Sequence, residues 1–228
     1  MKYLTIAAAV AVLPHTASAF DQYAALSSSR RDKSELAKAM SLVISAAMPT
    51  VTAGRRDEVI KDYEAGPPHK GQAIELGTAN FWRSTTHEKQ SVAGDRALEG
   101  CQLRYNRPCA LLAVDDEIAA EGELKPKDMP RLHYSGKFKL DQIPVMRLAA
   151  RKRGDVQGYD LAMEPKAMAI HPWGRVFISA GNPTLREAAE TALAKCNNDQ
   201  DRNGRDGPCF LYSMNNDVVL PQRLTAPK

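Results

Sequence analysis

The chain has 228 residues, of which 43% are hydrophobic and 25% are charged, with a formal net charge of +4. These values are ordinary for a folded soluble domain, and no stretch after the N-terminus is apolar enough to form a membrane helix. The basic clusters at residues 30–33 and 151–153 contain no aromatic residues. A nucleic-acid-binding protein would have a basic stripe or a known binding module, so we expect no nucleic acid partner.

Residues 1–19 have the pattern of a secretory signal peptide. Lys2 precedes a short apolar run at residues 3–13, and Ala17-Ser18-Ala19 is a small-residue cleavage site. The run is too short to cross a bilayer, and no cysteine follows the cleavage site to carry a lipid anchor. The alternative is a buried N-terminal helix. We expect an exported protein, periplasmic or extracellular, with no membrane span.

A single helix is predicted within residues 20–48, ahead of the rest of the fold. Asp32 can cap it with Glu35 three residues later, and Pro49 ends it or begins the next helix. Its apolar face is expected to contain Leu36, Met40, Val43 and Ala47.

The remainder of the chain contains one unit twice, at residues 49–119 and 143–220. Tyr63 and Tyr159, and likewise Lys70 and Lys166, are 96 positions apart, and Cys101 and Cys196 are 95 apart. A constant offset of this kind indicates an internal repeat. A polar linker at residues 120–142 joins the units, and residues 221–228 form a tail.

Each unit is predicted to have the same order of elements. In the first unit these are a helix at residues 53–64, strands at 72–76 and 80–84, a helix ending near Cys101, and a strand after Cys109. The second unit has a helix at 145–159, strands at 167–171 and 175–179, a helix capped by Thr184 and Glu187, and a strand after Cys209. Pro49 and Pro144 suit the first turn of a helix. The fold class is therefore α+β: two tandem helix–strand–strand–helix–strand units with antiparallel pairing.

Four cysteines in an exported protein favour disulfides, and four cysteines allow three connectivities. If each unit folds on its own, each closes its own bridge, which pairs Cys101 with Cys109 and Cys196 with Cys209. The alternative is a zinc site, but these spacings are not the short Cys-x-x-Cys pairs of structural zinc sites.

The second unit contains Ile143-Pro144, Tyr159, Pro165-Lys166-Ala167, residues 192–196 ending in Cys196, and Cys209-Phe210-Leu211-Tyr212. This order resembles uncharacterised two-cysteine repeat modules of secreted proteobacterial proteins, which often occur in tandem. The first unit departs from the pattern at Met48, Lys70-Gly71-Gln72 and Leu112. The resemblance implies a fold and cross-links, and it implies no activity.

The sequence contains no recognisable catalytic or cofactor-binding motif. The histidines are scattered along the sequence. One possible function is that of a periplasmic hydrolase, the alternative to a binding protein, and it would need His171 or His87 beside a carboxylate. Asp199, Asp201 and Asn203 alternate as in a calcium loop, but residue 210 is Phe where that loop needs Glu, so calcium binding stays open. We expect no cofactor, no metal and no catalytic residue.

The function that we expect instead is binding, through a surface with aromatic side chains. Trp82, Trp173, Tyr105 and Tyr212 could line a binding face or fill the core, and Trp173 and Tyr212 are the leading candidates. Lys70 and Lys166 could bind an anion or end a solvated strand. We therefore expect a non-enzymatic exported module that binds an envelope protein or a small ligand.

Overall fold

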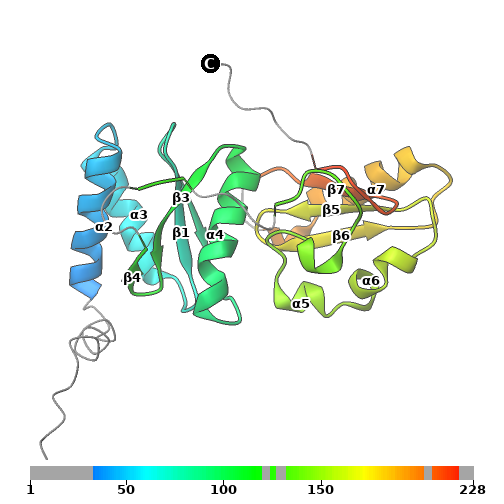
Figure 1. The fold of residues 1–228 in the computed structure, drawn as a ribbon, viewed down its shortest axis with the longest axis horizontal. Coiled ribbons are helices and arrows are strands. Elements are labelled where there is room, and N and C mark those ends of the chain that lie inside the picture. The colour runs from blue at the N-terminus through cyan, green and yellow to red at the C-terminus, as the bar shows by residue number, and fades with distance from the viewer. Residues whose placement is uncertain (1–32, 120–123, 127–131, 203–206, 221–228) are drawn as a thin grey trace, which may run out of the picture.

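The computed structural model describes residues 33–119, 124–126, 132–202 and 207–220. The predicted signal peptide, its cleavage site and the tail at 221–228 lie outside the described residues, as do Asp32 and Asn203. Two units follow one another along the long axis of the molecule (Figure 1). No helix in the described ranges combines the length and apolarity needed to cross a bilayer.

The first unit is a four-stranded antiparallel sheet between helices. The strand order is β2-β1-β3-β4, and α2 and α3 cover one face while α4 covers the other (Figure 1). The elements are α2 (Lys33–Ala47), α3 (Ala53–Ala65), β1 (Gly71–Glu75), β2 (Asn80–Ser84), α4 (Gln90–Tyr105), β3 (Cys109–Val114) and β4 (Glu117–Ile118).

The second unit has a sheet of the same order, β6-β5-β7-β8, again antiparallel. Helix α7 covers one face and short helical turns cover the other. The elements are η1 (Leu140–Gln142), α5 (Leu148–Arg151), α6 (Gly154–Gln157), η2 (Tyr159–Leu161), β5 (Ala167–His171), β6 (Arg175–Ser179), α7 (Leu185–Asn197), η3 (Gln200–Arg202), β7 (Phe210–Met214) and β8 (Asp217–Val218). The predicted α+β class with two similar units is confirmed.

Aligned positions make the same contacts in both units. Each central strand has an irregularity at the same point, between Gln72 and Ala73 in β1 and between Met168 and Ala169 in β5. The two aligned lysines are also equivalent. The Nζ of Lys70 donates to the carbonyls of residues 64 and 66, and the Nζ of Lys166 donates to those of residues 160 and 162.

Lys70 and Lys166 are both buried, so the prediction of a solvated strand end was wrong. Each ammonium group lies over a tyrosine ring, Tyr63 or Tyr159, with the nitrogen 4.8 or 5.2 Å from the ring centroid. Burial of a charged amine costs free energy unless hydrogen bonds replace its water, and the carbonyls supply those bonds. Both lysines therefore tie the chain ahead of the central strand to the preceding helical segment.

Both predicted disulfides are present. Cys101 in α4 is bonded to Cys109 at the start of β3, with Cα atoms 6.3 Å apart. Cys196 in α7 is bonded to Cys209, just before β7, with Cα atoms 6.0 Å apart. Each bridge fixes the end of a helix to the beginning of the neighbouring strand, and by the chain-entropy model each contributes roughly 3 kcal/mol of stability.

The helix predictions needed three corrections. The buried positions of α2 are Leu36, Met40 and Ile44, followed by Met48, because an exact four-residue spacing faces the sheet; Val43 is only partly buried and Ala47 is exposed. Neither Pro49 nor Pro144 begins a helix, since each lies in a turn that precedes one. The helix expected at 145–159 is split into α5, α6 and η2.

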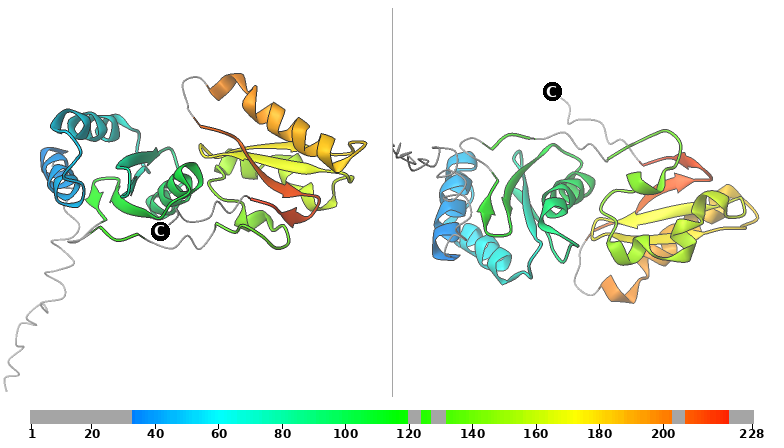
Figure 2. Two further views of the ribbon diagram at one scale, coloured as in Figure 1. Left: turned by 90° about the horizontal axis from the view of Figure 1, so that it is seen from above. Right: turned by 60° about the horizontal axis from the view of Figure 1, so that its bottom comes forward.

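The two units pack through α4 (Figure 2). Glu99 accepts the backbone N–H of Val145 at 2.6 Å and the guanidinium of Arg96 at 2.7 Å, and both charged side chains are buried. Leu103 of α4 belongs to the core of the second unit. The predicted polar linker is anchored as well, since Leu124 is buried in the first core and Leu132 in the second.

Candidate functional site

A groove with a volume of about 440 Å³ lies along the outer edge of β2. Four elements of the first unit and one turn of the second contribute to its wall. The lining residues are Arg55, Val59 and Asp62 of α3, Gln72 of β1, Phe81, Trp82 and Arg83 of β2, Arg104 and Tyr105 of α4, and Trp173 of the β5–β6 turn.

The backbone of β2 faces this groove. In the described sheet β2 is an edge strand, paired with β1 alone. The carbonyl of Phe81 accepts the Tyr105 hydroxyl at 2.9 Å, so it points away from β1. In an antiparallel ladder, alternate residues direct both N–H and C=O to the same side. The N–H of Phe81, and the N–H and C=O of Arg83, therefore point outward into the groove.

The charged side chains of the groove are mostly basic. Among the described residues, Arg55, Arg83 and Arg104 line it, against the carboxylate of Asp62. Arg55 lies over the Phe81 ring at 5.9 Å and Arg104 over the Tyr105 ring at 5.8 Å. A guanidinium group on an aromatic face can still direct the donors at its edge toward a carboxylate. One Nη of Arg55 is already paired with Glu58 at 2.8 Å.

The aromatic wall crosses the boundary between the units. The ring centroids of Trp82 and Trp173 are 4.9 Å apart, and those of Trp82 and Tyr105 are 6.4 Å apart with an edge-to-face angle of 81°. Gly100 of α4 makes this packing possible, because a Cβ there would collide with the Trp82 indole. Burial raises the pKa of Tyr105, which therefore keeps its hydroxyl proton and donates to Phe81.

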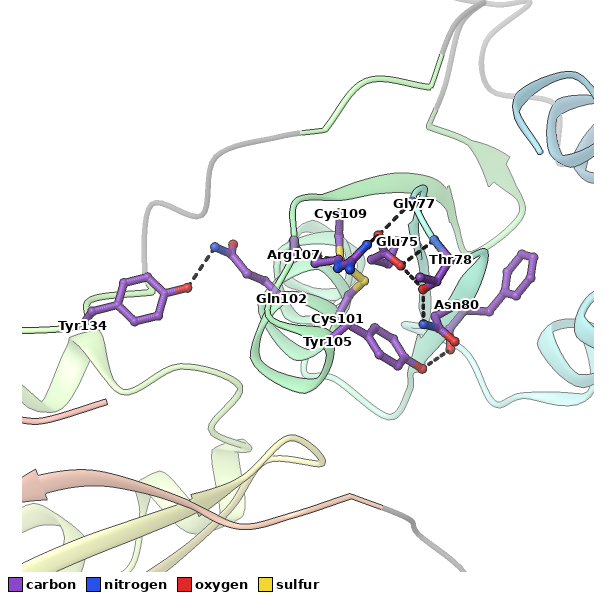
Figure 3. The surroundings of a disulfide bond; sticks show 11 residues. Glu75, Gly77, Thr78, Asn80, Cys101, Gln102, Tyr105, Arg107, Cys109 and Tyr134 are labelled. Atoms are coloured by element: carbon purple, nitrogen blue, oxygen red, sulfur yellow. Dashed lines mark hydrogen bonds and ion pairs between the residues drawn. A yellow bond between two sulfur atoms is a disulfide. The ribbon is translucent and has the colours of Figure 1, made fainter. Parts of the chain in front are cut away.

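The disulfide Cys101–Cys109 holds the end of α4 on which Tyr105 lies (Figure 3). Beside it, the buried carboxylate of Glu75 accepts the N–H groups of Gly77 and Thr78 at 2.8 and 2.9 Å. These contacts fix the β1–β2 turn from one side and α4 from the other. The edge of β2 and the aromatic wall are thus positioned by a covalent bond and a satisfied buried charge.

Three of the four aromatic residues singled out in the sequence, Trp82, Trp173 and Tyr105, lie together in the groove. Tyr212 does not. Its side chain is fully buried, and its hydroxyl donates to the Gln142 carbonyl at 3.1 Å. Tyr212 is therefore a core residue of the second unit, and the prediction that it forms a binding surface does not hold.

His87 lies within hydrogen-bond distance of a hydroxyl, as the hydrolase alternative requires. Its Nε2 is 2.7 Å from Ser84 Oγ. Burial, together with the charges of Arg96 and Arg147, lowers the pKa of His87 to about 4. Within the described ranges no carboxylate is hydrogen-bonded to its other ring nitrogen, and neither residue lines the groove. The pair lacks the third group that orients a catalytic base.

His171 has a structural role that explains its burial. Its Nδ1 accepts the N–H of Trp173 at 3.3 Å, and its Nε2 is 3.3 Å from the Gly207 carbonyl. Glu75 occupies the aligned position in the first unit, where it accepts the N–H two residues later and pairs with Arg107, the counterpart of Gly207. Both side chains close the hairpin turn at the end of the central strand.

The possible calcium ligands Asp199 and Asp201 both bind Arg175, at 2.8 and 3.1 Å, so a guanidinium occupies their oxygens. Over the residues that the structure describes, no group of histidines, cysteines and carboxylates could hold a metal ion. The third predicted ligand, Asn203, lies outside that part of the chain.

Comparison with family models, curated proteins and solved structures gives no match to this chain. Sequence reasoning missed Arg55, Arg83 and Arg104, because each comes from a different element and none belongs to a recognisable motif. Only the fold brings the three side chains to one edge.

Proposed function

We propose that this is an exported, non-enzymatic binding protein whose ligand site is the groove at the edge of β2. The observation that carries the proposal is the convergence of three arginines and four aromatic rings on one groove. Arginine, tryptophan and tyrosine are the residues that contribute most binding energy at interfaces. The net positive charge selects a ligand with carboxylate or other anionic groups beside apolar ones.

The contacts of the histidines favour binding over hydrolysis. His171 contacts the β5–β6 turn with Nδ1 and the Gly207 carbonyl with Nε2, and His87 is buried away from the groove with a pKa of about 4. A histidine that stays neutral near pH 7 can act as a base, but catalysis also needs an orienting group and access to substrate. The groove offers access and charge, and none of the described residues that line it is a histidine or a cysteine.

An anionic aromatic dye tests the groove as a binding site. The chain has two tryptophans, and both line the groove, so energy transfer from tryptophan to bound anilinonaphthalene sulfonate reports on this site. We expect saturable transfer from the folded protein. Replacing Arg83→Gln or Arg104→Gln should weaken binding by about tenfold, because each removes a charge-assisted contact.

Arg186→Gln is the matched control, since Arg186 is an exposed arginine of α7 that is paired with Glu190 outside the groove. It should leave the affinity unchanged. Equal loss in all three variants would indicate a general charge effect, and no saturable transfer in the unaltered protein would refute the groove as a ligand site.

Export to the periplasm or beyond is part of the same proposal. Two disulfides are compatible with an oxidising compartment, and the N-terminal sequence has the pattern of a leader. Intact-mass analysis of protein recovered from the cell envelope should give a chain beginning at Phe20. A mass that retains residues 1–19 would contradict cleavage.

A further inference from the structure

The open backbone of β2 specifies the kind of ligand, if the groove binds ligands as proposed above. We propose that the groove binds an extended acidic peptide segment of a partner protein, which joins the sheet as a fifth strand beside β2. In this mode, main-chain hydrogen bonds supply affinity and the flanking side-chain pockets supply selectivity.

The outward groups of β2 are available for such pairing. The N–H of Phe81 and both backbone groups of Arg83 face the groove, and the described residues place no hydrogen-bond partner on them. The neighbouring walls come from α3 on one face of the sheet and α4 on the other. A segment in the groove would therefore lie in the plane of the sheet with side chains directed to both walls.

The equivalent edge in the second unit is covered. There, Lys195 donates from Nζ to the Ile178 carbonyl at 2.9 Å. Arg153 donates to the Val176 carbonyl at 2.6 Å, as the Tyr105 hydroxyl does to the equivalent Phe81 carbonyl, so the two edges differ at Ile178 and Arg83. Ile178 corresponds to Arg83, because each is opposite the second residue of its central strand. Natural proteins protect edge strands with such charged side chains. The first unit has Gly100 at the position of Lys195, so no side chain reaches the Arg83 carbonyl from there.

The charges of the groove identify the occupant. Arg55 is paired with Glu58, but Arg83 and Arg104 still outnumber Asp62 among the described lining residues, so an incoming strand with carboxylate side chains gains ion pairs at the walls. A second copy of this chain paired through the same edge would instead bring two sets of three arginines together. An acidic partner segment fits the charges and a second copy does not.

Synthetic peptides test the proposal. The parent probe is acetyl-Glu-Val-Glu-Val-Glu-amide, and its charge-reversed counterpart replaces each Glu by Lys. Binding is followed by tryptophan emission of the protein. We expect saturable binding of the acidic peptide and at least tenfold weaker binding of the basic one. In a strand, only alternate residues direct their backbone groups to one side. N-methylation of one alternate set of amides should therefore abolish binding, and methylation of the other set should leave the peptide competent.

A backbone variant tests the same point in the protein. Proline at an edge position removes an outward N–H and leaves the inner ladder intact. Arg83→Pro should bind the acidic peptide roughly fivefold or more weakly than Arg83→Gln, while both bind the dye equally, because both lack the guanidinium. Circular dichroism confirms that each variant is folded.

The outcomes separate the two proposals. If the dye binds and both methylated peptides bind as tightly as the parent, the groove is an anion site and strand addition is overturned. If sedimentation shows a dimer in the absence of peptide, and Arg83→Pro makes it a monomer, the occupant is a second copy and the peptide proposal fails. If neither dye nor peptide binds, the proposed function itself fails.

Discussion

Trp82 and Trp173 lie against each other across the boundary between the two units, with ring centroids 4.9 Å apart and planes tilted by 44°. Trp82 is nearly fully buried, and both rings also line the groove at the edge of β2. One pair of side chains therefore belongs both to the packing of the units and to the candidate site. A change in the relative position of the units would alter the groove.

Removing one ring of this pair tests that link. Trp173→Ala should lower the free energy of unfolding by about 2 kcal/mol, since a large, partly buried ring loses its apolar and aromatic contacts. It should also change the near-ultraviolet circular dichroism of Trp82, whose environment opens. Trp173→Phe keeps an aromatic ring and should retain most of the stability. Equal stability of all three proteins by denaturant titration would show that the tryptophan contact does not hold the units together.

The buried Arg96–Glu99 pair should be sensitive to loss of one partner. Glu99→Ala removes the acceptor of both the guanidinium and the Val145 N–H, leaving a buried charge without compensation. We expect a loss of roughly 3–5 kcal/mol in urea unfolding. Glu190→Ala, which breaks an exposed helical pair with Arg186, is the control and should change little. A small effect of Glu99→Ala would mean that water reaches this junction.

His87 should make stability depend on pH. Burial lowers its pKa from 6.5 to about 4 in the folded protein, so the unfolded chain takes up the proton first as pH falls. The free energy of unfolding should therefore decrease between about pH 6.5 and pH 4, by an amount on the order of 3 kcal/mol from this group.

His87→Gln removes this contribution, so its stability should fall less steeply than that of the unaltered protein over the same pH window. Ser84→Ala should keep most of the dependence, because burial is the largest cause of the lowered pKa and the imidazole is still present. Parallel stability curves for the unaltered protein and His87→Gln would contradict the assignment.

The aligned lysines should respond alike to substitution. Lys166→Met leaves the carbonyls of Asp160 and Ala162 without their ammonium donor, and Lys70→Met does the same to those of Glu64 and Gly66. We expect each to cost roughly 2–3 kcal/mol by thermal or urea unfolding. Lys195→Met removes an exposed contact to one carbonyl and should cost less. A loss at one aligned lysine without the other would show that the two units use them differently.

The strands of the fold could be predicted because short apolar runs are bounded by turn residues. The spans 80–84, 167–171 and 175–179 agree with β2, β5 and β6, where Gly77-Thr78 and Pro172-Trp173-Gly174 mark the turns. The bridges could be predicted because the cysteines repeat with the rest of the unit, and a unit that folds on its own has to close its own bridge. The single helix predicted at 145–159 was wrong, because Lys152 and Arg153 separate α5 from α6 and Gly158 caps the end of α6.

The candidate site could be predicted only in part. Aromatic residues are few, so Trp82, Trp173 and Tyr105 stood out in the sequence, and Tyr212 stood out equally although it fills the core. Arginines are common, and nothing local distinguishes Arg83 from an ordinary solvated residue. Whether an edge strand is covered depends on a side chain from a helix far away in the sequence. Lys195 of α7 covers the Ile178 carbonyl of β6, whereas the aligned residue of α4, Gly100, has no side chain that could cover β2. Such a contact arises only in the folded chain.

Leu103 belongs to the chain of the first unit and to the core of the second. Because α4 supplies this leucine, residues 132–220 on their own would leave part of their core open to water. Expressed alone, the second unit should therefore be less stable than it is within the whole chain, and the two similar halves of the molecule are not interchangeable.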